Sequence, residues 1–284
     1  MILVTGAGGT VGSEVVKQLK AAGAQFRVGF HSPAKAEKAK AEGLAPVLFD
    51  FADRASVAAA LQGADKLFLL SGNMPNQVEA ETAAVEEAKK AGVKHIVKLS
   101  VLQADKERYS FARWHRAVEK AIEKSGVAYT FLRPTGFMQN FVTYQSGSIR
   151  GQGALYEPMD AKVSHVDVRD VAAVAVKALL SPGHEGKAYE LTGPEALSYG
   201  QVADKISRAT GREVRAVFTG PEAARQSMLG MGMPPFMVDA VLDLQEVYAT
   251  GASEKVYPDI EQVTGRRARS FDDFLRDHLK AFQP

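Results

Sequence analysis

The sequence contains no cysteine, and this absence excludes several classes of site. Without thiols the chain forms no disulfide, thiolate zinc site or iron–sulfur cluster, and it has no cysteine nucleophile. It also lacks a run of about 20 apolar residues that would span a membrane. No signal peptide precedes the first apolar segment. We therefore expect a cytoplasmic protein with no membrane partner.

An excess of charge of one sign is absent as well. The 35 Lys and Arg residues nearly balance the 33 Asp and Glu residues, which leaves a formal net charge of +2. No strong field attracts nucleic acid, so we expect no nucleic-acid partner. The sequence also lacks a His, Asp and Glu set with metal-ligand spacing, and it lacks a Gly-x-Ser-x-Gly turn. We predict no metal and no hydrolase chemistry.

The order of apolar segments predicts the fold class. With 284 residues, 46 % of them hydrophobic, the chain suffices for one large α/β domain or two closely packed lobes. Short apolar strands alternate with helices in the first half, and these strands are expected at 2–4, 25–30, 46–50, 66–70, 95–100 and 129–133. This alternation predicts a doubly wound parallel sheet of Rossmann type, with helices on both faces.

The regular alternation of strands and helices ends after Pro134, which suggests a second lobe. We expect residues 1–134 to form an NAD(P)-binding domain, with the helix at 167–180 returning to its sheet. Residues 135–165 and 185–284 are expected to form a smaller, mainly helical lobe that binds substrate. In doubly wound sheets the ligand lies beyond the carboxyl ends of the strands. The residues that end each strand are therefore the first candidates for a site.

A glycine-rich turn follows the first strand at once. It reads Thr5-Gly6-Ala7-Gly8-Gly9-Thr10-Val11-Gly12, and a helix pattern begins immediately afterwards. A tight turn between a strand and a helix N-terminus directs backbone N–H groups at an anion such as a pyrophosphate. A glycine-rich turn without a ligand is the alternative. The context favours a dinucleotide cofactor.

The end of the second strand bears on which cofactor is bound. NAD-preferring proteins usually carry an acidic residue there, whereas this chain has His31, Ser32 and Lys35. We therefore expect NADP(H) to be favoured over NAD(H). The predicted cofactor-binding residues are Gly6, Gly8, Gly9, Thr10, Val11, Gly12, His31, Ser32, Lys35, Asp50, Phe51, Ser71, Gly72, Ser100, Pro134 and Phe137.

Several motifs together resemble the NmrA-like branch of the atypical short-chain dehydrogenases/reductases. They are the glycine turn and the segments 92–97, 126–134, 165–172 and 183–193. The resemblance covers nearly the whole chain. It is closest to NADPH-dependent quinone, azo-dye and triphenylmethane-dye reductases. It implies a Rossmann lobe and a small C-terminal lobe, with an aromatic acceptor held over the nicotinamide.

The sequence offers two candidates for the proton donor. No tyrosine is followed four residues later by lysine, so the usual Tyr-x-x-x-Lys pair of short-chain dehydrogenases is missing. Tyr109 and His115 are the remaining catalytic candidates. Glu119 lies four residues after His115 on one helical face and is expected to raise the pKa of that histidine. A purely structural His115–Glu119 pair is the alternative.

An aromatic segment after the sixth strand supplies candidates for binding the acceptor: Phe137, Met138, Phe141 and Tyr144. Quinones and azo dyes are already electrophilic, so their reduction demands little acid–base help from the protein. We therefore expect an NADPH-dependent reductase acting on a small aromatic acceptor. A non-catalytic NADP(H) sensor that regulates a protein partner is the alternative, and the oligomeric state stays open between monomer and homodimer.

Overall fold

The computed structural model describes residues 1–283, and these divide into two compact units. Unit 1 comprises Met1–Lys106, Ala112–Arg133 and Val168–Glu190. Unit 2 comprises Glu107–Phe111, Pro134–Asp167 and the remainder from Leu191. No helix within residues 1–283 combines the length and the apolar character needed to cross a bilayer.

Unit 1 is built on a seven-stranded sheet with the order β3-β2-β1-β4-β5-β6-β9. The strands are β1 (Ile2–Val4), β2 (Phe26–Phe30), β3 (Pro46–Leu48), β4 (Lys66–Leu69), β5 (His95–Leu99), β6 (Ala128–Pro134) and β9 (Lys187–Leu191). The pairs from β3 through β6 are all parallel. The central strands are apolar on both faces because helices cover both of them, as the apolar runs of the sequence predict.

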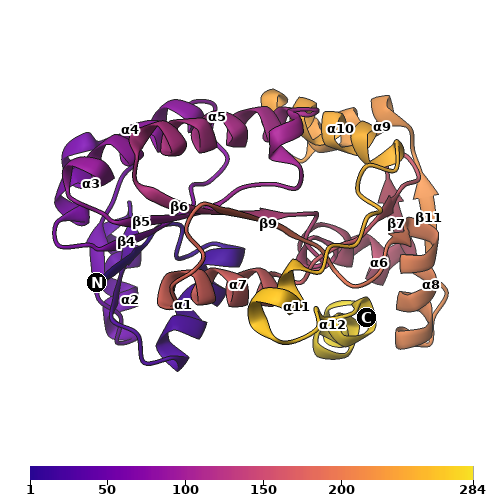
Figure 1. Cartoon of the computed structure of the whole chain (residues 1–284). Helices are drawn as coiled ribbons and strands as arrows, with labels where there is room; N and C mark the ends of the chain where they lie inside the picture. The colour runs from indigo at the N-terminus through magenta and orange to yellow at the C-terminus, as the bar shows by residue number, and fades with distance from the viewer. Residues whose placement is uncertain (284) are drawn as a thin grey trace. The chain divides into compact units, whose positions relative to one another are not determined.

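Helices flank this sheet on both sides (Figure 1). On one face lie α3 (Arg54–Leu61), α4 (Gln77–Lys90) and α5 (Ser110–Ser125). On the other lie α1 (Thr10–Ala21) and α7 (Val168–Leu180), which pack against each other. The helix α2 (Pro33–Ala41) connects β2 to β3. The predicted Rossmann-type α/β fold is confirmed.

The strand β9 differs from the expected layout. Residues from 185 onward are expected in the smaller lobe, yet β9 is the seventh strand of the large sheet. Its backbone is bonded to the neighbouring strand through Gly186 N–H to the Tyr129 carbonyl at 2.7 Å. The pairing extends the sheet by one strand beyond β6.

Unit 2 combines short strands with helices around its own apolar core. Its elements are η2 (Phe141–Gln145), α6 (Ser146–Gln152), β7 (Ala154–Glu157), β8 (Lys162–Val163), β10 (Leu197–Ser198), α8 (Tyr199–Thr210), β11 (Arg215–Phe218), α9 (Pro221–Gly230), α10 (Pro235–Ala249), α11 (Asp259–Thr264), α12 (Phe271–His278) and η3 (Leu279–Ala281). The strand β7 pairs in parallel with β11, and β8 pairs antiparallel with β10. Phe271, Phe274 and Phe282 are buried in this core.

A buried carboxyl group lies at the end of β7. Glu157 accepts hydrogen bonds from the Gln145 and Gln245 amides at 3.3 and 3.2 Å. Burial raises the pKa of Glu157 to about 8, although the Gln145 hydrogen bond acts in the opposite direction. The folded protein therefore keeps this carboxyl protonated at pH values where the unfolded chain has released the proton.

Replacing Glu157 with glutamine should remove a pH dependence of stability. The raised pKa contributes stability that is present below the unfolded carboxyl pKa and is lost as pH rises towards 8. We expect E157Q to unfold at higher urea concentration than the native chain at pH 8, and to change less between pH 5 and 8. The exposed Glu213→Gln is the control. Parallel pH dependence in E157Q and the native chain would contradict a protonated buried Glu157.

Candidate functional site

The glycine turn after β1 is held firmly at the carboxyl edge of the sheet of unit 1. The Thr5 hydroxyl donates towards the Phe68 and Leu70 carbonyls at 3.1 and 2.9 Å, and it accepts from the Leu70 N–H at 2.8 Å. Gly9 N–H donates to the Gly6 carbonyl at 2.9 Å and closes the turn. Thr5 thus fixes the turn to the neighbouring strand β4.

Glycine is required in this turn for steric reasons. Gly6 has a φ of +63°, and a Cβ atom there would lie 2.7 Å from the Leu70 side chain. A Cβ atom on Gly12 would lie 2.0 Å from the Gly6 carbonyl oxygen, a backbone atom that cannot move aside. The helix α1 therefore starts in close contact with the turn, as the spacing of the glycines predicts.

The N-terminus of α1 offers an anion site that fits a dinucleotide pyrophosphate. Gly9 occupies the N-cap position, and no side chain of the described residues caps the helix there. The first turn of the helix carries no acidic residue that would repel a phosphate. Backbone N–H groups and the helix dipole favour negative charge at such a terminus. Thr10 and Val11 begin the helix, so their backbone lies where a phosphate would be bound.

The ends of β2 and β3 carry the other predicted cofactor residues of this half. His31 and Lys35 are exposed, whereas the Ser32 hydroxyl accepts from the Lys35 N–H at 3.4 Å and caps α2. Asp50 is exposed and accepts from the Ala52 N–H at 3.0 Å. Phe51 is half-buried against Phe49. The segment 31–35 that follows β2 therefore carries the cationic Lys35 and no acidic residue, whereas Asp50 ends the neighbouring strand β3.

The serines at the ends of β4 and β5 both bind glutamates of the covering helices. The Ser71 hydroxyl donates to Glu81 of α4 at 2.6 Å, and the buried Ser100 hydroxyl donates to Glu119 of α5 at 2.7 Å. Gly72 next to Ser71 is exposed, with open space around the position of a Cβ atom. The hydroxyl hydrogens of both serines are thus engaged inside the protein.

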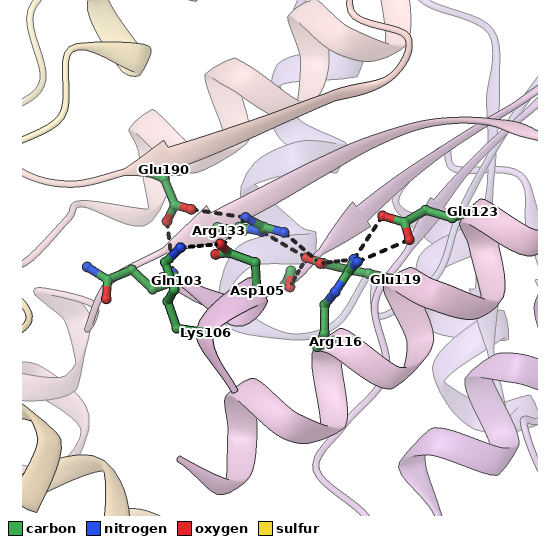
Figure 2. A network of polar contacts seen from close by, with 9 residues as sticks. Gln103, Asp105, Lys106, Arg116, Glu119, Glu123, Arg133 and Glu190 are labelled. Carbon is green, nitrogen blue, oxygen red and sulfur yellow. Dashed lines mark hydrogen bonds and ion pairs between the residues drawn. The ribbon is translucent and has the colours of Figure 1, made fainter. Parts of the chain in front are cut away.

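Arg133 organises a network of charges at the carboxyl end of β6 (Figure 2). Its guanidinium holds Glu119 in a bidentate pair at 3.0 and 2.7 Å, and it also contacts Asp105 and Glu190 at 3.1 and 3.2 Å. Burial alone would lower the pKa of Arg133, but the paired Glu119 and Glu190 raise it above its ordinary value. The network joins β6, β9 and α5 to the short helix η1 (Ala104–Lys106).

His115 does not have the partner that its sequence spacing suggests. Glu119 is bound by Arg116 and Arg133 (Figure 2) and also by the Ser100 hydroxyl. The expectation that Glu119 raises the pKa of His115 is therefore wrong. Instead, His115 Nδ1 lies 3.1 Å from the Lys98 ammonium. Burial and, next, the Lys98 charge lower the pKa of His115 well below its ordinary value. The imidazole is therefore neutral.

The remaining candidates belong to unit 2, where each has a different environment. Tyr109 is buried directly before α5, and Pro134 is the last residue of β6 and the first of its segment of unit 2. Met138 and Phe141 are enclosed in the core of unit 2, where Phe141 packs edge-on against Phe271 at 5.3 Å. The structure thus gives both a packing role. Phe137 is half-buried, and Tyr144 is 71 % exposed.

Lys98, Glu81 and Arg133 are buried charged residues that the search for a proton donor did not single out. Lys98 lies within the apolar strand His95-Ile96-Val97-Lys98-Leu99 and has no exposed side-chain surface. A lysine in the middle of such a strand is rarely buried without a charged partner. This signal was available in the sequence, but it did not reveal that Glu81 and His115 are its partners.

The whole chain matches a known family. Residues 1–275 match the NmrA-like family. The chain belongs to the NmrA-like family. It is 41 % identical over 284 residues to the NAD(P)H azoreductase of Xenophilus azovorans, covering 99 % of each chain. It is also 41 % identical, over 100 % of both chains, to the (4-alkanoyl-5-oxo-2,5-dihydrofuran-3-yl)methyl phosphate reductase of Streptomyces griseus.

A solved structure with cofactor agrees with this assignment. The NADPH complex of the quinone oxidoreductase QOR2 from Escherichia coli superimposes with a TM-score of 0.89 at 27 % identity. It covers 98 % of this chain and 100 % of that one. The relatives confirm the expected family and the expected class of enzyme, an oxidoreductase, and they support binding of a nicotinamide cofactor. They give no sign of the non-catalytic alternative.

Substituting Gly12 with alanine should abolish cofactor binding. The new Cβ atom would meet the Gly6 carbonyl at 2.0 Å, so the turn and the start of α1 must separate. We expect the affinity for NADPH to fall at least tenfold in a fluorescence titration. Gly151→Ala in α6 is the matched control, since open space surrounds that position. Unchanged NADPH affinity in G12A would exclude this turn as the phosphate site.

Proposed function

We propose that the chain is an NADPH-dependent reductase that transfers hydride to a quinone or a similar conjugated aromatic acceptor, of the azo or triphenylmethane dye type. The observation that carries the proposal is that two features lie at the same edge, the carboxyl edge, of the sheet of unit 1. A glycine turn and a helix N-terminus suited to pyrophosphate lie at this edge, and so does the neutral imidazole of His115, in a sequence without a Tyr-x-x-x-Lys pair.

Most of the residues that would hold the cofactor belong to unit 1. The backbone of Gly6–Gly12 and the N-terminus of α1 would bind the pyrophosphate. His31, Ser32 and Lys35 would face the ribose phosphate, and Asp50 and Phe51 would border the adenine. Ser71, Gly72 and Ser100 follow the strands nearer to the nicotinamide half, Pro134 ends β6, and Phe137 lies three residues beyond it. When bound, the reduced nicotinamide supplies the hydride.

The chain's own contribution is to orient the acceptor and to handle one proton. His115 is the first candidate donor because its imidazole is neutral and keeps 8 % of its surface exposed. Tyr109 is the second, as its phenol precedes α5. Phe137 and Tyr144 remain available to contact an aromatic ring, whereas Met138 and Phe141 would shape the site through packing. An electrophilic acceptor needs little more than orientation and one proton, because holding the acceptor correctly against the nicotinamide supplies most of the rate enhancement.

The relatives support this class of acceptor. One is named an azoreductase, one reduces a compound named as a dihydrofuranone phosphate, and one is named a quinone oxidoreductase. A double bond conjugated to electron-withdrawing groups is common to these three acceptor types. The test measures loss of NADPH absorbance with a simple quinone, an azo dye and a triphenylmethane dye. Protein-dependent turnover is expected, and tight NADPH binding without turnover on any acceptor would contradict the proposal.

The preference for NADPH rests on charge at the end of β2 and is testable there. Lys35→Glu introduces an acidic group beside the expected position of the 2′-phosphate. We expect kcat/KM for NADPH to fall about tenfold relative to that for NADH, which corresponds to about 1.4 kcal/mol. Lys40→Glu at the far end of α2 is the control. An unchanged NADPH/NADH ratio in K35E would show that this residue does not read the phosphate.

A further inference from the structure

Four polar side chains, three of them buried and Ser71 half-buried, contact one another in series at the carboxyl edge of the sheet of unit 1. The Ser71 hydroxyl donates to Glu81 Oε1 at 2.6 Å, and Glu81 Oε2 pairs with the Lys98 ammonium at 2.9 Å. Lys98 Nζ lies 3.1 Å from His115 Nδ1. Glu81 and Lys98 have no exposed side-chain surface. This series of side-chain contacts connects the end of β4 with α4, β5 and α5.

The Lys98 ammonium determines which nitrogen of His115 carries the proton. An ammonium group has only donors, so the neighbouring Nδ1 must accept, and the proton of the neutral ring resides on Nε2. Lys98 also donates to the Leu99 carbonyl and forms an ion pair with Glu81, so the ammonium is held on two further sides. Among residues 1–283, no residue forms a hydrogen bond with His115 Nε2.

The charges around the imidazole favour its neutral form. Burial lowers the pKa of His115 most, and the Lys98 charge lowers it further. Glu81 lies on the far side of Lys98, and its carboxylate is engaged by Ser71 and the ammonium. Glu119, one turn along α5, is occupied by Ser100, Arg116 and Arg133. Among residues 1–283, Lys98 is the charged side chain that acts on the imidazole.

We propose that Lys98 is a positioning residue that fixes His115 as a neutral Nε2–H donor and replaces the proton that His115 passes to the reduced acceptor. This inference rests on the proposed function, because it assigns the source of the proton in that same reaction. His115 contacts the acceptor, whereas Lys98 acts only through His115. Glu81 and Ser71 hold the ammonium in place.

The proton transfer balances without any further reactant. After hydride addition the acceptor carries a negative charge on oxygen or nitrogen. The Nε2–H bond breaks and an O–H or N–H bond forms on the acceptor, while one Lys98 N–H bond breaks and an Nδ1–H bond forms. Lys98 is left as a neutral amine. A solvent proton taken up at Nε2 and return of the Nδ1 proton to Lys98 restore the initial state.

The class of acceptor determines how strongly the reaction rate depends on proton transfer from Lys98 through His115. Hydride addition to a quinone leaves a phenolate, a weak base that can depart before it is protonated. Addition to an azo group leaves a nitrogen anion, a much stronger base that must be protonated in place. Removing the Lys98 proton should therefore slow azo reduction far more than quinone reduction.

The first arm of the test observes the tautomer directly and needs no substrate. In ¹⁵N spectra of the histidine rings, with His115 assigned by its loss in His115→Gln, the native chain should show one protonated and one bare nitrogen from pH 5.5 to 8.5. Lys98→Met should give a mixture of both tautomers. Lys98→Met combined with Glu81→Gln removes both buried charges and covers the case in which the single variant fails to fold.

The second arm measures kinetics in the same variants. We expect Lys98→Met to lower kcat for an azo dye about a hundredfold and for a quinone less than fivefold, with the NADPH affinity unchanged. In a His115→Gln background the Lys98 substitution should cause no further loss. Lys94→Met, at a lysine exposed before β5, is the matched control.

The outcomes separate the two proposals. An unchanged His115 tautomer in Lys98→Met and in the double variant would overturn the role of Lys98, whatever the native activity. Equal losses for azo dye and quinone, or additive losses with His115→Gln, would also overturn it. Absence of turnover by the native chain on every acceptor would instead contradict the proposed function, while the ring-nitrogen spectra would still report the tautomer.

Discussion

Two buried cations, Lys98 and Arg133, set the arrangement of the carboxyl edge of the sheet in unit 1. A charge without access to water must be matched by protein groups, because its desolvation cost is otherwise prohibitive. The Glu81 carboxylate of α4 forms an ion pair with Lys98, and the Glu119 carboxylate of α5 forms one with Arg133. These two pairs attach the covering helices to the ends of β5 and β6. His115, which is proposed to act on the acceptor, therefore lies on a helix whose position against the sheet is fixed by the Glu119–Arg133 pair.

This arrangement explains how a reductase can work without the Tyr-x-x-x-Lys pair. In that pair a lysine adjusts the acidity of a tyrosine on the same helix. Here the lysine lies on a strand, and it contacts a histidine on the covering helix at 3.1 Å. A neutral imidazole with a fixed tautomer is a weak acid but a well-oriented donor. Such a donor suits acceptors that accept hydride readily and need only one proton afterwards.

Much of the fold could be predicted because its signals are local. The apolar strands of unit 1 and the spacing of Gly6, Gly9 and Gly12 depend on neighbours in the sequence, and the structure has them as expected. Residues 140–165 lack a clear period, and there the sequence did not predict η2, α6, β7 or β8. Short segments of this kind are determined by packing rather than by their own pattern.

The candidate site was harder to predict because its partners are distant in the sequence. The spacing of His115 and Glu119 suggested a pair, but Glu119 is bound by Arg133, which lies 14 residues after it in the sequence. Lys98 reaches His115 only because β5 and α5 are adjacent in the fold. Met138 and Phe141 matched the pattern of a binding surface, yet the core of unit 2 encloses them. Polarity and spacing identify candidate residues, but only the fold determines which of them meet.

Hydride transfer from the cofactor can be observed in a single-turnover reaction with NADPH deuterated at the transferred position. The protein would be mixed with one equivalent of labelled or unlabelled NADPH and an excess of quinone, and the cofactor absorbance followed. The account predicts protein-dependent oxidation that deuterium slows severalfold, with the label recovered on the reduced acceptor or exchanged from its hydroxyl into solvent. Oxidation at the rate of the protein-free control, with NADPH still bound, would contradict it.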